Sequence, residues 1–471
     1  MHLNKHLTLI YFLLLTYTST AFSETFYLTA KDNLQSAINK SNRGDTLILS
    51  SGRYSGNFIV SKPLSIVGSK TEEKTIIDAL GTGNAITLAS SHIRIEHLTI
   101  VNWGKNLTEQ NAAIFSNKKI DNQRVSHLNI NNNSLKGDGF GIWLNNVTQT
   151  EIFNNTVQGN IEMRSADRGN GIQISNVTNS HIFNNETFET RDGIYVISSE
   201  NNVIESNSMH DLRYGIHYMY SYDNTVKNNI ADNTRAGFAL MSSRRLLISG
   251  NTTTNSEDYG FLLNFITDST FENNVIKNVW TKPENKVLGR DGKGLFVYNS
   301  GYNVIKNNIV DTTEIGIHLT AGSENIQIFG NSFINNPVQV KYVSNKKQEW
   351  SKEQRGNYWS NYLGWDIDNN GIGDTVFEPN DGIDKLVWQY PELKMLMDSP
   401  AVLMIRWVQK QFPVLKSPGV KDSYPLMRLP AGNNFNKGAN QNNDVFERKP
   451  TNNKQLGSVL SPMQRETQGV L

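Results

Sequence analysis

The sequence predicts an all-β fold, a right-handed parallel β-helix in which coils of about 22 residues are stacked on one another. Two markers that recur in step support this prediction. A glycine that opens an alternating apolar stretch returns at spacings of 30, 22, 22, 22, 23, 34 and 22 residues, and an asparagine returns with the same two long insertions. The glycines are Gly141, Gly171, Gly193, Gly215, Gly237, Gly260, Gly294 and Gly316, and the asparagines are Asn155, Asn185, Asn207, Asn229, Asn251, Asn274, Asn308 and Asn331.

The period is too short for a pair of helices and lacks the consensus of leucine-rich repeats, so each period is interpreted as one coil of a pectin-lyase-like solenoid. Consecutive coils then lie about 4.8 Å apart, which is the ordinary spacing between strands. We expect the glycine where a bend needs a positive φ or a close backbone approach. We expect the asparagine at a corner, where it tolerates the left-handed conformation and hydrogen-bonds its neighbours along the stack.

The alternation after each glycine separates inward from outward side chains. The first and third residues after the glycine are apolar and are predicted to fill a narrow core, whereas the second and fourth point outward. The inward pairs are Ile194/Val196, Ile216/Tyr218, Phe238/Leu240, Phe261/Leu263, Leu295/Val297 and Ile317/Leu319.

Residues 1–23 have the features of a signal peptide. Lys5 precedes an apolar run over 7–15, and Ala21 to Ser23 fit a cleavage site. A membrane anchor is the alternative, but the run has about nine residues where a bilayer needs about 20. We therefore expect an exported chain from which the signal is removed.

The β-helix itself is predicted over 24–344, with a helix at the stretch NLQSAINK as the cap of its first coil. The two long spacings place surface insertions near 156–170 and 277–293. These insertions interrupt the period without ending it, because the glycine and asparagine markers resume in step after each one.

A capping and docking region is predicted over 345–430, where the repeat stops and aromatic residues are frequent. It contains an amphipathic helix from Ser399 to Gln411, with Ser399 as N-cap and Pro400 at the first helical position. Residues 431–471 are rich in Asn, Gln and Lys and poor in apolar residues, and they are predicted to be disordered.

The composition limits the chemistry that the chain can perform. With 45 basic and 44 acidic residues, no overall charge points to nucleic acid as a partner. The chain has no cysteine, so an exported form cannot rely on disulfides. Any binding of a soft metal must therefore use methionine and histidine.

A candidate Cu(I) site follows from stacking the outward positions of consecutive coils. Met219 and Met241 occupy the fourth position after their glycines and should lie about 5 Å apart on one outer face, with His217 beside Met219. Two thioethers and an imidazole suit Cu(I), which prefers soft ligands. His210, on the bend before this coil, is a fourth candidate. The alternative is that these side chains simply cover a face against another segment.

A row of arginines is predicted beside this face, because Arg191, Arg213 and Arg235 each lie two residues before a repeat glycine. Glu189 and Asp211 fall on the same side. Either these arginines contact an anion or a partner, or the repulsion between their like charges is offset by carboxylates within the solenoid.

The stretch DIDNNGIGD resembles a calcium-binding loop. Asp366, Asp368 and Asn370 take the first, third and fifth positions, the carbonyl of Ile372 the seventh, and Asp374 the ninth. The twelfth position, which should supply a bidentate glutamate, is a phenylalanine. A structural Ca²⁺ ion and a plain turn rich in Asp and Asn are both open.

An enzyme that acts on polysaccharides is a further alternative, because parallel β-helices often bind or cleave such polymers. Lyases and epimerases of this kind need clustered carboxylates with a base in a cleft. Asp192, Asp211, Asp258 and Tyr214 are the residues that could be assigned to this role. They occupy bend positions where Asp is ordinary, and no second column of carboxylates accompanies them, so we expect a protein that is not an enzyme. A purely structural scaffold is the third alternative.

Several blocks of the sequence resemble the NosD family of periplasmic maturation proteins of nitrous-oxide reductase. The blocks include RDGIYVISSENN, LRYGIHYMYSYDN, GNYWSNYLGWDIDNNGIGD and QFPVLKSPGVKDSYPLM, and the resemblance extends over roughly 25–430. It implies an accessory protein without catalytic residues or an organic cofactor. The resemblance also raises the expectation that the Cu(I) candidates bind transiently delivered copper.

The partners implied by this resemblance are an ABC permease with its ATPase, a lipoprotein copper chaperone and apo nitrous-oxide reductase, with no nucleic acid. Membrane association would come through the permease rather than through a span of the chain itself. Copper and a sulfur species both remain open as the cargo for the copper–sulfur centre. Apolar residues of the predicted helix, such as Leu403, Met404, Ile405, Trp407 and Val408, could pack on the permease or cap the bare edge of the solenoid.

Overall fold

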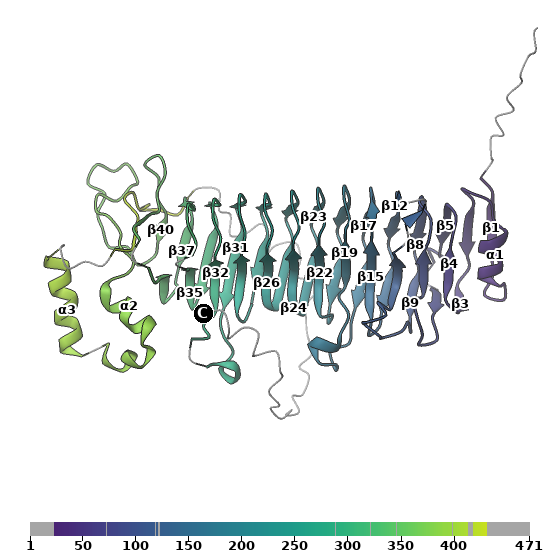
Figure 1. Cartoon of the computed structure of the whole chain (residues 1–471), viewed down its shortest axis with the longest axis horizontal. Helices are drawn as coiled ribbons and strands as arrows, with labels where there is room; N and C mark the ends of the chain where they lie inside the picture. The colour runs from purple at the N-terminus through teal and green to yellow at the C-terminus, as the bar shows by residue number, and fades with distance from the viewer. Residues whose placement is uncertain are drawn as a thin grey trace, which may run out of the picture. The chain divides into compact units, whose positions relative to one another are not determined.

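The structure is a computed structural model that describes residues 23–430, except for 72, 118, 121, 122, 288, 321, 345, 398 and 413–417. The predicted tail over 431–471 and all but the last residue of the predicted signal peptide lie outside the described residues. Within the described part, short strands from successive coils pair in parallel along the solenoid (Figure 1). The predicted all-β, right-handed parallel β-helix is confirmed.

Each complete coil contributes strands to three parallel ladders. The first ladder is a 13-stranded sheet formed by β1 (Thr25–Leu28), β2 (Thr46–Leu49), β5 (Leu64–Val67), β8 (Ile93–Glu96), β13 (Asn129–Asn131), β17 (Glu151–Phe153), β20 (His181–Phe183), β23 (Val203–Glu205), β25 (Thr225–Lys227), β27 (Leu247–Ser249), β30 (Thr270–Glu272), β33 (Val304–Lys306) and β36 (Gln327–Phe329).

The second and third ladders are joined, because β24 (Ser208–Met219) and β26 (Ile230–Met241) are long enough to belong to both. The second ladder also contains β3 (Gly52–Ser55), β6 (Thr75–Asp78), β9 (Thr99–Val101), β14 (Ser134–Lys136), β18 (Thr156–Gln158), β21 (Glu186–Phe188), β28 (Thr252–Thr254), β31 (Val275–Val279), β34 (Ile309–Thr313), β37 (Ser332–Ile334) and β40 (Tyr358–Trp359). The third contains β4 (Phe58–Val60), β7 (Ile86–Leu88), β10 (Ala112–Ser116), β15 (Phe140–Asn145), β19 (Ile172–Ser175), β22 (Asp192–Ile197), β29 (Tyr259–Asn264), β32 (Lys293–Tyr298), β35 (Ile315–Leu319) and β38 (Val338–Tyr342).

Two small sheets lie outside these ladders. One is formed by β11 (Lys119–Ile120), β12 (Gln123–Ser126) and β16 (Val147–Thr148), and the other by β39 (Gln348–Glu349) and β41 (Val420–Lys421).

The repeat glycines are explained by close backbone approach and not by a positive φ. A Cβ atom added to Gly215 would lie 2.5 Å from the carbonyl oxygen of Gly237 and 2.7 Å from the Cβ of Ala231. None of the eight repeat glycines has a positive φ. Of the two reasons that the sequence allowed, only the close backbone approach therefore applies.

The asparagine ladder is present, with its side chains inside the bends. Asn207 Nδ2 donates to Asn229 Oδ1 at 2.9 Å, and Asn229 Nδ2 donates to Asn251 Oδ1 at 3.0 Å. The expected left-handed conformation falls instead on the preceding residue, as at Asn228 with a φ of 56°. The ladder continues beyond residue 344, because Asn331 donates to Asn357 next to β40.

The predicted inward pairs fill the core between the ladders. All twelve side chains are buried, and stacked pairs such as Phe238 and Phe261, with centroids 4.4 Å apart, follow the axis of the solenoid. Aromatic stacking adds to the burial of apolar surface. Tyr218 belongs to this core, and its hydroxyl has no hydrogen-bond partner among the described residues.

The first coil is covered by the expected helix, α1 (Leu34–Lys40). Asn33 caps its N-terminus by accepting from the N–H of Ser36 at 2.8 Å. Leu34 and Ile38 are buried in the core, so the helix closes the apolar end of the solenoid. An exposed sheet end is thereby protected from pairing with other chains.

Beyond the last coils the chain forms α2 (Gly382–Gln389), the 3₁₀ helix η3 (Pro391–Leu396) and α3 (Pro400–Gln411). Ser399 caps α3 and Pro400 occupies its first position, as the sequence predicts. The Lys385 ammonium group on α2 donates to the carbonyl of Ser344 at 2.7 Å, which attaches this region to the solenoid.

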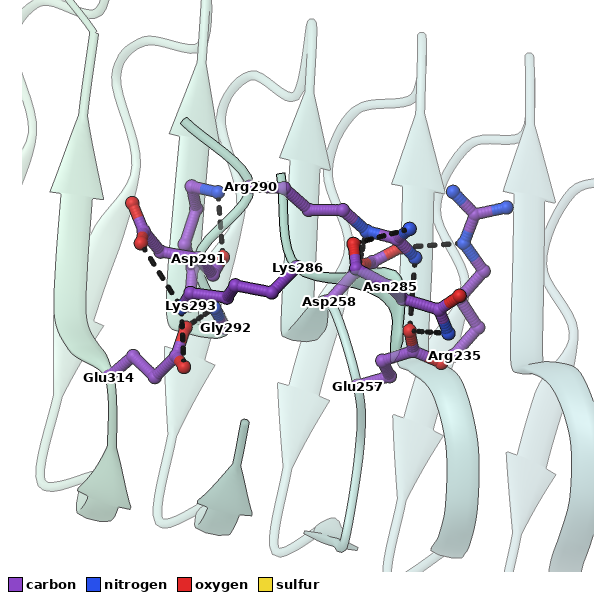
Figure 2. Close-up of polar contacts among 10 residues, drawn as sticks. All are labelled: Arg235, Glu257, Asp258, Asn285, Lys286, Arg290, Asp291, Gly292, Lys293 and Glu314. Carbon is purple, nitrogen blue, oxygen red and sulfur yellow. Dashed lines mark hydrogen bonds and ion pairs between the residues drawn. The ribbon is translucent and has the colours of Figure 1, made fainter. Parts of the chain in front are cut away.

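The insertion after β31 folds back along the third ladder and is held by ion pairs, as Figure 2 shows. It includes the short 3₁₀ helix η2 (Pro283–Asn285). Arg290 Nε lies 2.8 Å from Asp258 Oδ1, and Lys286 Nζ lies 2.7 Å from Glu314 Oε1. Acidic residues from two coils thus hold the second half of the insertion against the solenoid.

Candidate functional site

The predicted Cu(I) ligands lie on the outer side of the third ladder, where β24 and β26 run side by side. Met219 and Met241 are register partners, and both are partly exposed. Ile216 and Tyr218, which alternate with the ligands along β24, are fully buried in the core. The two thioethers and the imidazole of His217 therefore share one outer face, as the stacking of coils predicts.

His217 lies on this outer side but is only 8% exposed, because neighbouring side chains enclose it. The ring of Tyr195 on the preceding coil stacks on the imidazole with centroids 4.5 Å apart. The ring of Tyr214 meets its edge at 5.2 Å. The remaining nitrogen, Nε2, is buried and has no hydrogen-bond partner among the described residues.

Asp192 is the polar partner of His217. Its Oδ2 atom lies 3.0 Å from His217 Nδ1, and its two carboxylate oxygens accept from Nε and Nη2 of Arg213 at 2.8 and 2.7 Å. Burial raises the pKa of this carboxyl, but hydrogen bonds from His217 and Arg213 and the guanidinium charge outweigh burial and lower the pKa to about 2. Asp192 is thus a buried carboxylate whose charge is compensated.

The sulfur of Met219 has a polar neighbour as well. The hydroxyl of Tyr195 donates to Met219 Sδ at 3.1 Å, while the ring of the same tyrosine covers His217. Tyr195 therefore connects the imidazole and the nearer thioether. A thioether is a weak hydrogen-bond acceptor, so this contact leaves the sulfur available to a better partner.

His210 belongs to a different group, in the part of β24 that lies in the second ladder. Its ring stacks on Phe188, and its Nδ1 lies 2.7 Å from Asp211 Oδ2. The Glu186 carboxylate, 3.5 Å from Nε2, raises the pKa of His210, burial opposes this, and Asp211 adds to the increase. His217, Met219 and Met241 lie together on one face. His210 lies with Glu186 and Asp211 instead, and it is separated from that face by a bend of the backbone at Asp211.

Arg213 and Arg235 of the arginine row are offset by charge pairing, with partners other than those expected, whereas the buried Nε of Arg191 has no hydrogen-bond partner among the described residues. Arg213 pairs with Asp192, and Arg235 Nε lies 2.5 Å from Asp258 Oδ2. Asp211 instead contacts His210, and it accepts from Asn233 at 2.6 Å. The carboxylates that pair with the arginines come from the adjoining coils, which the equivalent positions within one coil do not reveal.

The ion pairs of Asp192 and Asp258 also concern the alternative that the protein is an enzyme acting on polysaccharides. Asp192 binds Arg213 and His217, and Asp258 binds Arg235 and Arg290. Each carboxylate is therefore engaged at a separate place along the solenoid. Among the described residues no group of three or more His, Asp and Glu side chains is arranged to hold a metal ion.

The predicted calcium loop lies within the described residues, and it forms no such group either. Asp366 accepts from the N–H groups of Asn370 and Gly371 at 3.0 and 2.9 Å, and Asp374 accepts from that of Ile367 at 2.7 Å. The acidic side chains thus stabilise the turn and do not converge as ligands. The structure fits a turn rich in Asp and Asn, and it does not support the Ca²⁺ ion for which Asp366, Asp368, Asn370, Ile372 and Asp374 were the candidates.

Two residues of the site were not expected from the sequence. Asp192 occupies the position before Gly193, where the other coils carry Phe, Asn, Tyr, Ala, Lys or Ile. Tyr195 occupies the same outer column as His217, one coil earlier. The alignment of coils that pairs Met219 with Met241 also pairs Tyr195 with His217, so Tyr195 could have been found from the sequence. Asp192 could not, because it contacts His217 diagonally from a position that is not equivalent to it in the repeat.

The region of α2 and α3 carries many exposed apolar side chains. Leu403, Met404 and Trp407 on α3 are 57%, 67% and 60% exposed, and Met395 on η3 is 92% exposed. Two cavities of about 290 and 300 Å³ lie between α2 and the last coils, both lined by Val338 and Trp388. None of the helices among the described residues is long and apolar enough to cross a membrane.

Comparison with known proteins identifies relatives over most of the chain. The family model described as "Periplasmic copper-binding protein (NosD)" matches residues 153–364. A protein named "Probable ABC transporter binding protein NosD" from Pseudomonas aeruginosa is 51% identical over 81% of this chain and 88% of its own length. The protein of the same name from Stutzerimonas stutzeri is 46% identical over 81% of this chain and 86% of its own length.

A similar fold occurs among solved structures at low sequence identity. The A-module of a mannuronan C-5 epimerase from Azotobacter vinelandii matches 67% of this chain and 95% of its own, with 14% identity and a TM-score of 0.45.

Proposed function

The chain belongs to the NosD family, and from this premise we propose that it is a periplasmic accessory protein in the maturation of nitrous-oxide reductase. In this proposal it receives Cu(I) from a lipoprotein chaperone and hands it on, together with an ABC transporter, to the copper–sulfur centre of the apo-enzyme. The observation that carries the proposal is the single outer face on which His217, Met219 and Met241 lie together.

The donor set suits Cu(I) as a cargo. Met219 and Met241 supply soft thioethers from adjacent strands, and Nε2 of His217 is a buried nitrogen without a hydrogen-bond partner among the described residues. The chain offers no thiolate that would hold the ion more firmly. A site of this kind favours transfer over permanent storage.

The copper part of the proposal is tested by replacing both thioethers. The double variant Met219→Ala/Met241→Ala should bind Cu(I) at least about ten-fold more weakly in a competition titration with a colorimetric chelator. The matched control is Met395→Ala/Met404→Ala, which removes two exposed methionines outside the solenoid and should leave affinity unchanged. Equal affinity of the first double variant and the parent, with unchanged far-UV circular dichroism, would contradict the proposed site and favour a sulfur species as cargo.

We also propose that the chain binds and transfers its cargo without catalysing a reaction on a polysaccharide. The support is that Asp192 and Asp258 are each committed to arginines on separate coils. Incubation with acidic and neutral polysaccharides should produce no new reducing ends. Cleavage that is lost in Asp192→Asn would restore the enzyme alternative.

The exposed apolar side chains of α3 are the proposed contact with the permease. A chain truncated before residue 390 should no longer co-purify with the ATPase–permease complex, because it lacks Leu403, Met404 and Trp407. A chain that ends at residue 430 is the control and should co-purify normally. The triple variant Leu403→Ser/Met404→Ser/Trp407→Ser narrows the test to this surface, and its normal co-purification would contradict the assignment.

A further inference from the structure

We infer that Asp192, anchored by Arg213, is a positioning residue that keeps the proton of His217 on Nδ1 and so leaves the lone pair of the buried Nε2 atom free, on the outer side of the ladder. This inference rests on the proposed function of His217 as a ligand of soft metal ions. It concerns a residue that would not touch the cargo itself.

The carboxylate of Asp192 determines which nitrogen of His217 carries the hydrogen. An ionised carboxylate can only accept, so the nitrogen of His217 that faces it, at 3.0 Å, must carry the hydrogen. In a neutral imidazole the other nitrogen is then the acceptor. The contact therefore selects one of the two tautomers, the one whose Nε2 is free to bind a metal.

Asp192 is itself held in place. Both of its oxygens accept from Arg213 in a two-point pair, and the side chain of Asp192 is 1% exposed. The guanidinium group of Arg213 lies over the ring of Tyr214, 4.3 Å from its centroid. With its oxygens engaged in this way, Asp192 is not available as a ligand, and carboxylate oxygen is in any case a poor partner for Cu(I).

Two tyrosine rings hinder rotation of the His217 ring, so Nε2 cannot turn toward another hydrogen-bond partner. Tyr195 stacks on one face at an interplanar angle of 19°, and Tyr214 stands against it at 78°. The buried Nε2 atom is left without a partner among the described residues, although an unsatisfied buried nitrogen is unfavourable. Hydrogen bonds from a carboxylate to the far nitrogen of a metal-binding histidine serve the same purpose in known metal sites.

The tautomer is tested directly, without copper, by nitrogen-15 NMR of histidine side chains in mildly alkaline buffer. The parent protein should show His217, assigned by its loss in His217→Gln, with the proton on Nδ1. Asp192→Ala should shift the proton toward Nε2 and lower Cu(I) affinity about 10- to 100-fold. The matched control is Asp258→Ala, which removes another arginine-paired carboxylate at a separate place along the solenoid and should change neither.

Different variants test the role of Asp192 and the copper site, so one can fail while the other holds. A parent protein with the proton of His217 on Nε2, or an Asp192→Ala variant with the parent's tautomer and affinity, would overturn the inference even if Met219→Ala/Met241→Ala loses copper. In the reverse result, the Nδ1 proton depends on Asp192 but the copper affinity does not depend on the methionines. That result would support the positioning role of Asp192 and contradict the proposed copper site. Far-UV circular dichroism shows that each variant is folded.

Discussion

The indole Nε1 atom of Trp359 donates a hydrogen bond of 2.8 Å to Oδ2 of Asp422, a residue 63 positions later in the chain. Oδ2 also accepts from the backbone N–H of Asn357 at 2.7 Å, so Asp422 occupies the place of the next asparagine in the ladder. Burial raises the pKa of Asp422 to about 6, although the hydrogen bonds oppose this effect. The last rung of the solenoid is thus closed by a segment from beyond α3.

Replacing Asp422 by Ala should destabilise this end of the solenoid. The N–H of Asn357 and the indole N–H of Trp359 would both lose a buried acceptor, at a cost of about 3 kcal/mol. Chemical denaturation followed by tryptophan fluorescence measures the change. Glu353→Ala, at an exposed position nearby, is the control and should be neutral. A loss below about 0.5 kcal/mol in Asp422→Ala would show that the closing segment is not required for stability.

The asparagine ladder should be intolerant of truncation at its centre. Asn229 is fully buried, accepts from Asn207 at 2.9 Å and donates to Asn251 at 3.0 Å. Asn229→Ala therefore leaves donors and acceptors unsatisfied on two coils and should lower the free energy of unfolding by about 3 kcal/mol. The neighbouring exposed Asn228, with a φ of 56°, provides the control, because glycine accepts that conformation and Asn228→Gly should be near neutral. Similar denaturation midpoints for both variants would contradict the role of the ladder.

The fold could be predicted largely because it is periodic. Spacing alone places Gly215, Asn229 and the inward pair Ile216/Tyr218, since each coil repeats the same geometry. Spacing does not reveal why each repeat position needs a glycine. Only the structure shows that the reason is the close approach of neighbouring backbones. Likewise, the left-handed residue is the one before the ladder asparagine, because the asparagine amide must point into the bend.

The candidate site could be predicted only in part, for the same physical reason. Met219 and Met241 occupy one column and are brought together by register. Asp192 and His217 are 25 residues apart, which is one coil plus three positions, so they are not register partners. Whether they touch depends on the reach of their side chains, which the repeat does not specify. The clamp between Arg290 and Asp258 depends on an insertion that follows no period.

Lys293 should make the stability of the protein depend on pH in the alkaline range. Burial lowers the pKa of this lysine to about 8, from 10.5 in an unfolded chain. Below pH 8 the folded protein bears the full cost of a buried ammonium group. As the pH rises from 8 to 10.5, the unfolded chain binds more protons than the folded one, so the contribution of this group to stability increases.

Lys293→Met tests this dependence, because it keeps the length of the side chain without the charge. The variant should be more stable than the parent at neutral pH, by about 3 kcal/mol at most, and the difference should shrink as the pH approaches 10.5. Urea unfolding at several pH values measures it, with the exposed Lys346→Met as control. A difference that is constant with pH would show that Lys293 remains charged when folded, held by the ring of Tyr259 and the carbonyl of Asp291.

Tyr195→Phe should strengthen Cu(I) binding. The phenylalanine keeps the ring that stacks on His217 but removes the hydroxyl that donates to Met219 Sδ at 3.1 Å. If the sulfur binds the ion, the hydroxyl competes for the same lone pairs, and its loss should raise affinity about two- to five-fold, the equivalent of a hydrogen bond of up to 1 kcal/mol. Tyr298→Phe, in the outer column of Met219 on a later coil, is the control in the same competition titration. Weaker binding in Tyr195→Phe would show instead that the hydroxyl orients the sulfur toward the ion, since the stacked ring is unchanged.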